Sequence, residues 1–165
     1  MPDYCLKYRP VDAAQSFGGG SDALRFSIKS PCDFMLFDTR RRLFYCLELK
    51  STKGGSISYE TKNSKQGRMI HLHQIKSLWE FGSYDYVVSG FVLNYRNETL
   101  GTERSFFMSI DDFLFMTSRL KKASCNIEDI TKYGALEIPG QKARTQYSWD
   151  IETLLDYGGH KYDKQ

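Results

Sequence analysis

Three side chains that could act on a phosphate ester stand in an otherwise apolar part of the sequence. Asp33 precedes the run FMLF, and Glu48 and Lys50 lie at the end of the run LFYCLELK. A buried charge without a partner is costly, so charged residues in such surroundings indicate that they have one. Carboxylate oxygens are preferred Mg²⁺ ligands, and a nearby lysine can position an attacking water or offset charge on phosphorus. These residue types therefore favour metal-assisted hydrolysis of a phosphate ester.

A hairpin would bring the three side chains to one face of a sheet. The charged stretch 39–42 separates the two apolar runs, and a turn centred there sets Asp33 opposite Glu48. Lys50 then shares that face, roughly 6–7 Å further along the strand. By the same count Asp38 lies on the order of 16 Å from Asp33. We therefore expect Asp38 to be a turn residue and no part of the cluster.

Two interpretations of the opposed carboxylates remain open. Like charges directly opposed in a sheet repel, unless they share a positive charge. In the first interpretation that charge is Mg²⁺, or Mn²⁺, bound by Asp33, Glu48 and the backbone carbonyl of Leu49, with waters and a phosphate as its other ligands. In the second, Lys50 only forms a salt bridge with Glu48 at the end of the sheet.

Other polar residues follow the hairpin. His71 and His73 are two positions apart and would not share one face of a helix, so a zinc site would need further ligands. We expect His73 to border the carboxylate site instead. Basic side chains of the polar stretch 51–68 could contact DNA phosphates, or could belong to a solvated loop. They are Lys53, Lys62, Lys65 and Arg68, and His73 is a further candidate for contacting DNA.

The elements that must position these residues alternate in type. Hydrophobic spacing and glycine positions predict strands at 24–28, 34–37, 43–47, 86–95 and 104–108, and helices at 69–81 and 111–120. This order predicts a mixed α/β domain with one central sheet. The stretch 51–68 is expected to be a flexible basic excursion, too polar for the core. The segment 124–165 is expected to be less regular.

Composition sets broad limits on the class of protein. The chain has 165 residues and 41% hydrophobic content, enough for one core, so we expect a single domain over residues 1–165. A net charge of +3 does not by itself separate a nucleic-acid binder from other proteins. Four cysteines without a Cys-x-x-Cys pair suit neither a zinc ribbon nor a disulfide scaffold. No run has membrane-spanning length and no leader pattern opens the chain, so we expect a cytoplasmic protein without a membrane partner.

Five segments in a fixed order carry a resemblance to a known family. They are SPCDF at 30–34, CLELKS at 46–51, HLHQI at 71–75, FVLNY at 91–95 with RSFFM at 104–108, and YGALEIP at 133–139. Together they resemble the PD-(D/E)xK nuclease superfamily and, within it, the RecU-type Holliday junction resolvases. The ordered set is far more specific than any one segment.

The resemblance implies a fold, an activity and roles for four residues. The fold is restriction-endonuclease-like α/β, with a central mixed sheet flanked by helices and a projecting polar loop or stalk after the E-x-K strand. The activity is that of a Mg²⁺-dependent homodimeric endonuclease that binds four-way DNA junctions and nicks two strands symmetrically. Asp33 and Glu48 would bind metal, Lys50 would be the catalytic lysine, and Gln74 would lie near the site on the next helix.

The sequence departs from the family pattern before Asp33. The family has a helix there with another acidic residue, whereas here a short segment around residues 4–10 precedes a glycine-rich stretch. Two alternatives follow: a non-catalytic or weakly catalytic junction- or DNA-binding protein on the same fold, or an endonuclease without junction specificity.

Overall fold

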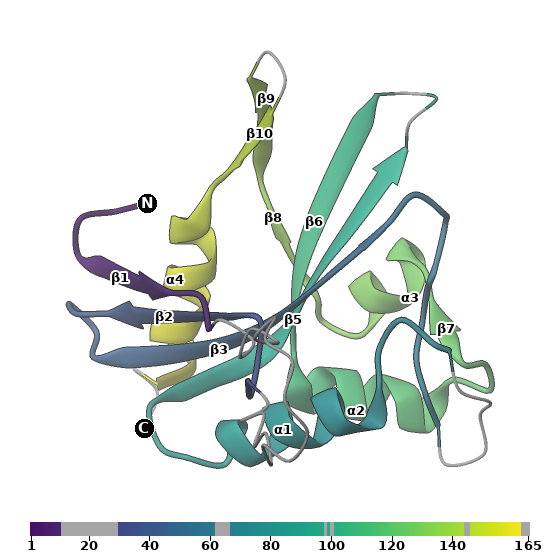
Figure 1. Cartoon of the computed structure of the whole chain (residues 1–165), viewed down its shortest axis with the longest axis horizontal. Helices are drawn as coiled ribbons and strands as arrows, with labels where there is room; N and C mark the ends of the chain where they lie inside the picture. Colours follow the sequence, from purple (N-terminus) through teal and green to yellow (C-terminus); the bar gives the residue numbers. More distant parts are fainter. Residues whose placement is uncertain (11–29, 62–66, 98, 100, 144–145, 163–165) are drawn as a thin grey trace, which may run out of the picture.

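A central six-stranded sheet with helices on both faces organises the chain (Figure 1). The computed structural model describes residues 1–10, 30–61, 67–97, 99, 101–143 and 146–162. The sheet has the order β1-β2-β3-β5-β6-β8, in which β3 and β5 are parallel and the other neighbours antiparallel. This arrangement confirms the predicted mixed α/β class. The predicted strand at 24–28 lies outside the described residues.

The bounds of the elements are as follows. The sheet strands are β1 (Cys5–Tyr8), β2 (Phe34–Asp38), β3 (Leu43–Thr52), β5 (Val87–Asn97), β6 (Thr102–Ser109) and β8 (Leu136–Ile138). Two smaller ladders pair β4 (Ile57–Ser58) with β7 (Ser124–Cys125), and β9 (Gly140–Ala143) with β10 (Gln146–Trp149). The helices are α1 (Leu72–Gly82), α2 (Ile110–Arg119), α3 (Ile127–Lys132) and α4 (Ile151–Tyr162). No helix among the described residues is long and apolar enough to cross a membrane.

The β2–β3 hairpin has the predicted register. Its residue pairs run from Asp38 with Leu43 at the turn to Phe34 with Leu47 at the other end. Asp33 and Glu48 are the next residue on each side. Asp38 is fully buried at the turn, where its carboxylate accepts backbone N–H bonds from Arg40 at 2.9 Å and Arg41 at 3.2 Å. The Arg41 guanidinium pairs with the same carboxylate at 2.8 Å. The expectation that Asp38 is a turn residue is therefore confirmed.

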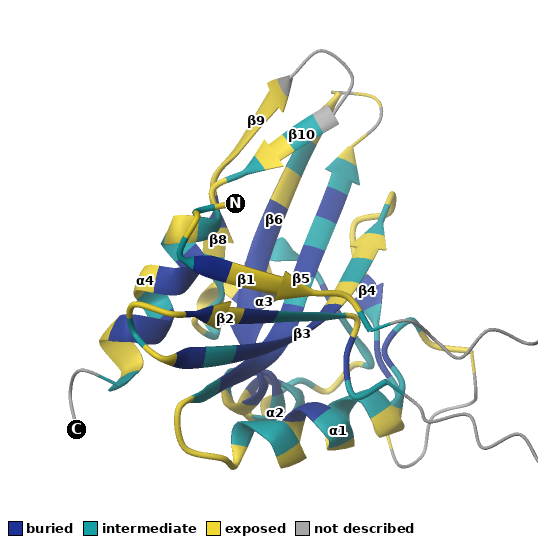
Figure 2. Cartoon of the chain, turned by 60° about the vertical axis from the view of Figure 1, so that its left-hand side comes forward, coloured by how far each residue is buried: buried dark blue, intermediate teal, exposed yellow. Residues whose placement is uncertain are grey.

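Each face of the sheet has its own hydrophobic core, and Figure 2 shows the resulting buried centre. Cys46 and Phe91 point to the α1 and α2 side, where they pack with Leu78 and Phe113. Their neighbours in the strands point to the other face, which α4 covers with Leu154 and Leu155. Strands buried on both faces read as continuous apolar runs, which is why 43–47 lacks alternation.

Residues 51–68 differ from the predicted excursion. Ser51 and Thr52 extend β3, and β4 then returns the chain to the body of the protein. Ile57 and Tyr59 are almost completely buried, and the Tyr59 hydroxyl donates a hydrogen bond to the Lys122 carbonyl at 2.6 Å. Among the described residues of this stretch, the exposed ones lie before Ile57 and after Tyr59.

The segment 124–165 is more regular than predicted, because it contains α3, α4 and four strands. Helix α4 is fastened to the sheet by the Tyr45 hydroxyl, which donates to the Leu155 carbonyl at 3.0 Å. A Cβ at Gly158 would lie 2.2 Å from that hydroxyl, and one at Gly159 would lie 2.7 Å from Arg41 Nε. The Gly158-Gly159 pair is thus the place where α4 meets the sheet.

Candidate active site

The predicted carboxylates and lysine meet at the far end of the β2–β3 hairpin. Asp33 immediately precedes β2 and reaches β3 through its Oδ2, which accepts the Leu49 N–H at 2.9 Å. Glu48 and Lys50 project from β3 on the α1 side, and Lys50 Nζ lies 3.0 Å from Glu48 Oε1. The salt bridge of the second interpretation is therefore present, and Asp33 lies within reach of the same pair.

Gln74 joins the cluster from the first turn of α1. Its Oε1 accepts the backbone N–H of His71 at 2.9 Å, which fixes the side chain at the start of the helix. Its Nε2 then donates to Glu48 Oε1. One Glu48 oxygen consequently receives hydrogen bonds from both Lys50 and Gln74.

Burial dominates the electrostatics of Glu48. The residue is only 4% exposed, and this desolvation raises the pKa of its carboxyl above the usual value. The hydrogen bond and charge of Lys50 oppose the rise in pKa, and the neighbouring Asp33 carboxyl adds to it. A buried carboxylate beside a second acid is a site where added positive charge is favourable.

Glu60 is an acidic residue near the start of α1 that sequence reasoning missed. Its Oε2 accepts the Leu72 N–H at 3.0 Å, and its Oε1 lies 3.0 Å from His71 Nδ1. These bonds lower the pKa of Glu60, the Leu72 N–H having the largest effect. Glu60 follows the buried Tyr59 and lies close to the HLHQI segment in space. Because polar residues surround Glu60 in the sequence, no hydrophobic pattern there predicted this contact.

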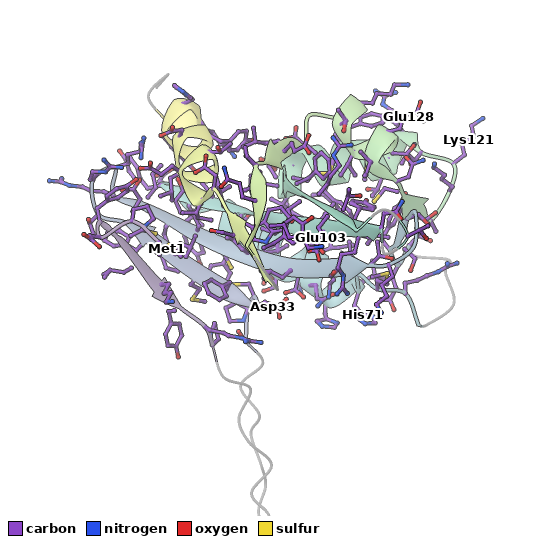
Figure 3. The ribbon with its side chains drawn as sticks, turned by 90° about the horizontal axis from the view of Figure 1, so that it is seen from above. Met1, Asp33, His71, Glu103, Lys121 and Glu128 are labelled. Atoms are coloured by element: carbon purple, nitrogen blue, oxygen red, sulfur yellow. The ribbon has the colours of Figure 1, made fainter. Side chains whose placement is uncertain are left out.

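His71 and His73 correct an expectation about their geometry. His71 precedes the helix with extended backbone angles, so helical spacing does not apply to this pair. Their rings stack at 5.5 Å between centroids with an interplanar angle of 10°. Among the described residues, no group of three His, Cys, Asp or Glu side chains is arranged to hold a metal ion. His73 is exposed one residue from Gln74, and Figure 3 shows His71 and Asp33 along the same side of the molecule.

The donor set at the hairpin end fits a hard cation. Two carboxylates supply oxygen atoms, one immediately before β2 and one in β3. Asp33 also holds the backbone at Leu49, the residue between Glu48 and Lys50. Mg²⁺ commonly uses one or two carboxylates and keeps several waters. The chemistry of the donors is therefore compatible with Mg²⁺ or Mn²⁺ bound by Asp33, Glu48 and the Leu49 carbonyl.

The basic residues predicted to contact DNA fall into two groups. Lys53 and Arg68 are described and exposed. Lys62 and Lys65 lie outside the described residues.

The chain is similar in structure to known proteins, although its sequence matches no family model. No curated protein matches it either. Among solved structures, the chain is similar to Hjc of the archaeal hyperthermophile Archaeoglobus fulgidus, a Holliday junction resolvase. The identity is 14% and the TM-score 0.43, over 81% of this chain and 83% of that one.

Proposed function

We propose that this protein is a metal-dependent DNA endonuclease that resolves four-way junctions by symmetric nicking as a homodimer. One observation carries the proposal: Asp33, Glu48, Lys50 and Gln74, from three separate segments, converge at the end of one hairpin. The ordered RecU-type motifs quoted above support the junction as substrate and the second copy as partner. Two symmetric cuts need two such sites, which a pair of identical chains supplies.

Each side chain has a distinct role in this proposal. Asp33 and Glu48 hold Mg²⁺ or Mn²⁺ together with the Leu49 carbonyl, and Gln74 orients Glu48. A bound Mg²⁺ supplies Lewis-acid polarisation of the phosphate and lowers the pKa of a bound water. Lys50 orients the attacking water or stabilises charge that develops on the phosphate oxygens.

A non-catalytic junction- or DNA-binding protein on the same fold is the second candidate. The observation that favours it is the engagement of Glu48 Oε1 by both Lys50 and Gln74. In this reading the cluster is a salt-bridged end of a sheet. An endonuclease without junction specificity is the remaining alternative, and it has the same site.

Nicking of a synthetic four-way junction separates the three candidates. We expect the wild type to nick the junction in Mg²⁺, and Asp33→Ala and Glu48→Ala to lose this activity while still binding the junction. Glu128→Ala removes an exposed carboxylate on a distant part of the molecule and should leave the rate unchanged (Figure 3).

Three outcomes would contradict the proposal in different ways. Tight junction binding by the wild type without any cleavage would favour the binding protein. Equal cutting of linear duplex and junction would remove the junction specificity. Cleavage that survives both substitutions would show that the catalytic site lies elsewhere.

A further inference from the structure

Two hairpins project from the sheet on the same side of the molecule, and one tyrosine ties them together (Figure 1). The first consists of β5 and β6, the second of β9 and β10. The Tyr147 hydroxyl of the second hairpin donates to the Gly101 carbonyl at 3.2 Å and accepts the Glu103 N–H at 3.2 Å. The ring of Tyr147 also stacks on Trp149, with 5.3 Å between centroids. The relative position of the hairpins is therefore fixed near their tips.

A polar pocket of about 370 Å³ lies between the hairpins. Its charged lining side chains are Arg96 and Lys142 against the single acid Glu103, and Tyr147 and Thr102 add hydroxyl groups. Arg96 Nε is buried and has no hydrogen-bond partner among the described residues. A buried guanidinium N–H without an acceptor is costly, so this pocket is suited to an anion that brings acceptor oxygens.

The pocket and the carboxylates lie on opposite faces of the sheet. Glu48 and Lys50 are level with Phe91 and Leu93 of β5 and share their face. Arg96 lies three positions beyond Leu93, roughly 10 Å further along the strand. Successive side chains of a strand point to opposite faces of the sheet, so Arg96 lies on the face opposite to Leu93. It shares the face of Val92, which packs in the core covered by α4.

We propose that this pocket binds a backbone phosphate of a DNA arm other than the arm held at Glu48. A straight duplex lying against one face of the sheet does not reach a pocket on the other. A four-way junction sends its arms in different directions, so it can occupy both places at once. Arg96 and Lys142 would then favour branched over linear DNA. This inference rests on the proposed nuclease site for the position of the first arm, but it concerns binding only.

Binding measured without cleavage tests the inference. Wild type, Arg96→Ala, Lys142→Ala and the double variant are titrated with a synthetic four-way junction and with a linear duplex, in EDTA and over a range of salt. One lost phosphate contact should weaken junction binding roughly tenfold at 0.1 M salt and lower the salt slope by about one. Binding to the linear duplex should stay unchanged.

Control variants keep the outcome interpretable. Lys121→Ala removes one exposed positive charge far from the hairpins and should alter binding to neither DNA. Lys142 is exposed, so its substitution does not endanger folding even if Arg96→Ala does.

Two results would overturn the inference. If the substitutions weaken binding to the junction and to the duplex equally, the pocket contributes only general charge attraction. If they weaken binding to neither DNA, the pocket binds no DNA phosphate. A wild type that binds the junction without cleaving it would contradict the proposed function and leave this inference standing.

Discussion

At the scale of single residues, Glu48 is where the requirements of stability and activity conflict. Its carboxylate is buried, paired with Lys50 and close to Asp33, and its pKa is raised for the reasons given above. A charged group in such a place weakens the fold in exchange for a site that can hold a cation. Substitutions here should therefore move stability and activity in different directions.

Glu48→Gln should abolish nicking while making the protein less sensitive to pH. Because the folded-state pKa is raised, the stability linked to the protonated carboxyl is present below the unfolded value of about 4.5. It is lost as the pH rises through the folded-state pKa. The melting temperature of the Gln variant relative to wild type should therefore increase as the pH rises from about 4.5 through the folded-state pKa of Glu48.

Two further measurements check this interpretation of Glu48. Glu128→Gln, at an exposed position, should track the wild type at every pH. Added Mg²⁺ should raise the melting temperature of the wild type and not that of Glu48→Gln. A constant difference across pH would contradict the role assigned to burial.

Gln74 offers a way to separate positioning from helix capping. Gln74→Ala removes the acceptor for the His71 N–H and the donor to Glu48, so we expect about 1 kcal/mol of lost stability. Nicking should fall by about 10–100-fold, as for other residues that orient a metal ligand. Gln74→Glu keeps the acceptor for the His71 N–H, but its charge repels the buried Glu48 carboxylate, so it should lose the activity and some stability as well. Equal activity of Gln74→Glu and wild type would show that Gln74 serves only the helix.

At the scale of elements, the β2–β3 turn sets the register on which the site depends. Asp38 holds that turn through two backbone N–H groups and the Arg41 guanidinium. Arg41 also pairs with the exposed Asp156 of α4, so one arginine joins the turn to the helix. The two partners of Arg41 differ in burial, which gives a matched comparison.

Asp38→Ala should destabilise the protein far more than Asp156→Ala. Loss of the buried partner leaves two backbone N–H groups and Nη1 of Arg41 without their acceptor, at a cost of roughly 3 kcal/mol. Loss of the exposed partner should cost less than about 1 kcal/mol. Urea unfolding of both variants measures the difference, and equal effects would show that the turn is not held by Asp38.

The fit of α4 against the sheet is a second feature of element packing. Alanine is a better helix former than glycine by about 1 kcal/mol, which alone would make Gly158→Ala stabilising. The 2.2 Å approach of its new Cβ to the Tyr45 hydroxyl outweighs this gain, so we expect a net loss of about 1–3 kcal/mol. Gly55→Ala, where no atom lies within 4 Å, is the control and should change stability little. A Gly158→Ala variant as stable as wild type would mean that α4 can shift away from Tyr45.

At the scale of the whole molecule, the sequence predicted best what is encoded locally. The β2–β3 register follows from apolar runs on either side of a short charged turn, so the meeting of Asp33, Glu48 and Lys50 could be deduced. The order of later strands and helices was likewise readable from hydrophobic spacing. The family resemblance pointed to Gln74, which the structure places against Glu48.

What the sequence did not predict depends on contacts between distant segments. Ile57 and Tyr59 are isolated apolar residues in a polar stretch, and only their packing against β7 and α2 makes them part of the core. Glu60 reaches His71 because the buried Tyr59 beside it holds this part of the chain in place. Helix α4 was not predicted, because glycines such as Gly158 and Gly159 disfavour an isolated helix. In the folded protein a glycine is favourable at position 158, where a Cβ would lie 2.2 Å from the Tyr45 hydroxyl.

The topology of β3 has a consequence for the order of folding events. On one side β3 pairs with β2 across a short turn, and on the other it pairs in parallel with β5, with Lys50 opposite Leu93, about forty residues later. Contacts close in sequence form faster than distant ones. We expect amides of the β2–β3 hairpin to gain hydrogen-exchange protection before those of β5 in a pulse-labelling experiment. A newly made chain would thus carry its two acids and lysine on a formed ribbon before the rest of the sheet closes around them.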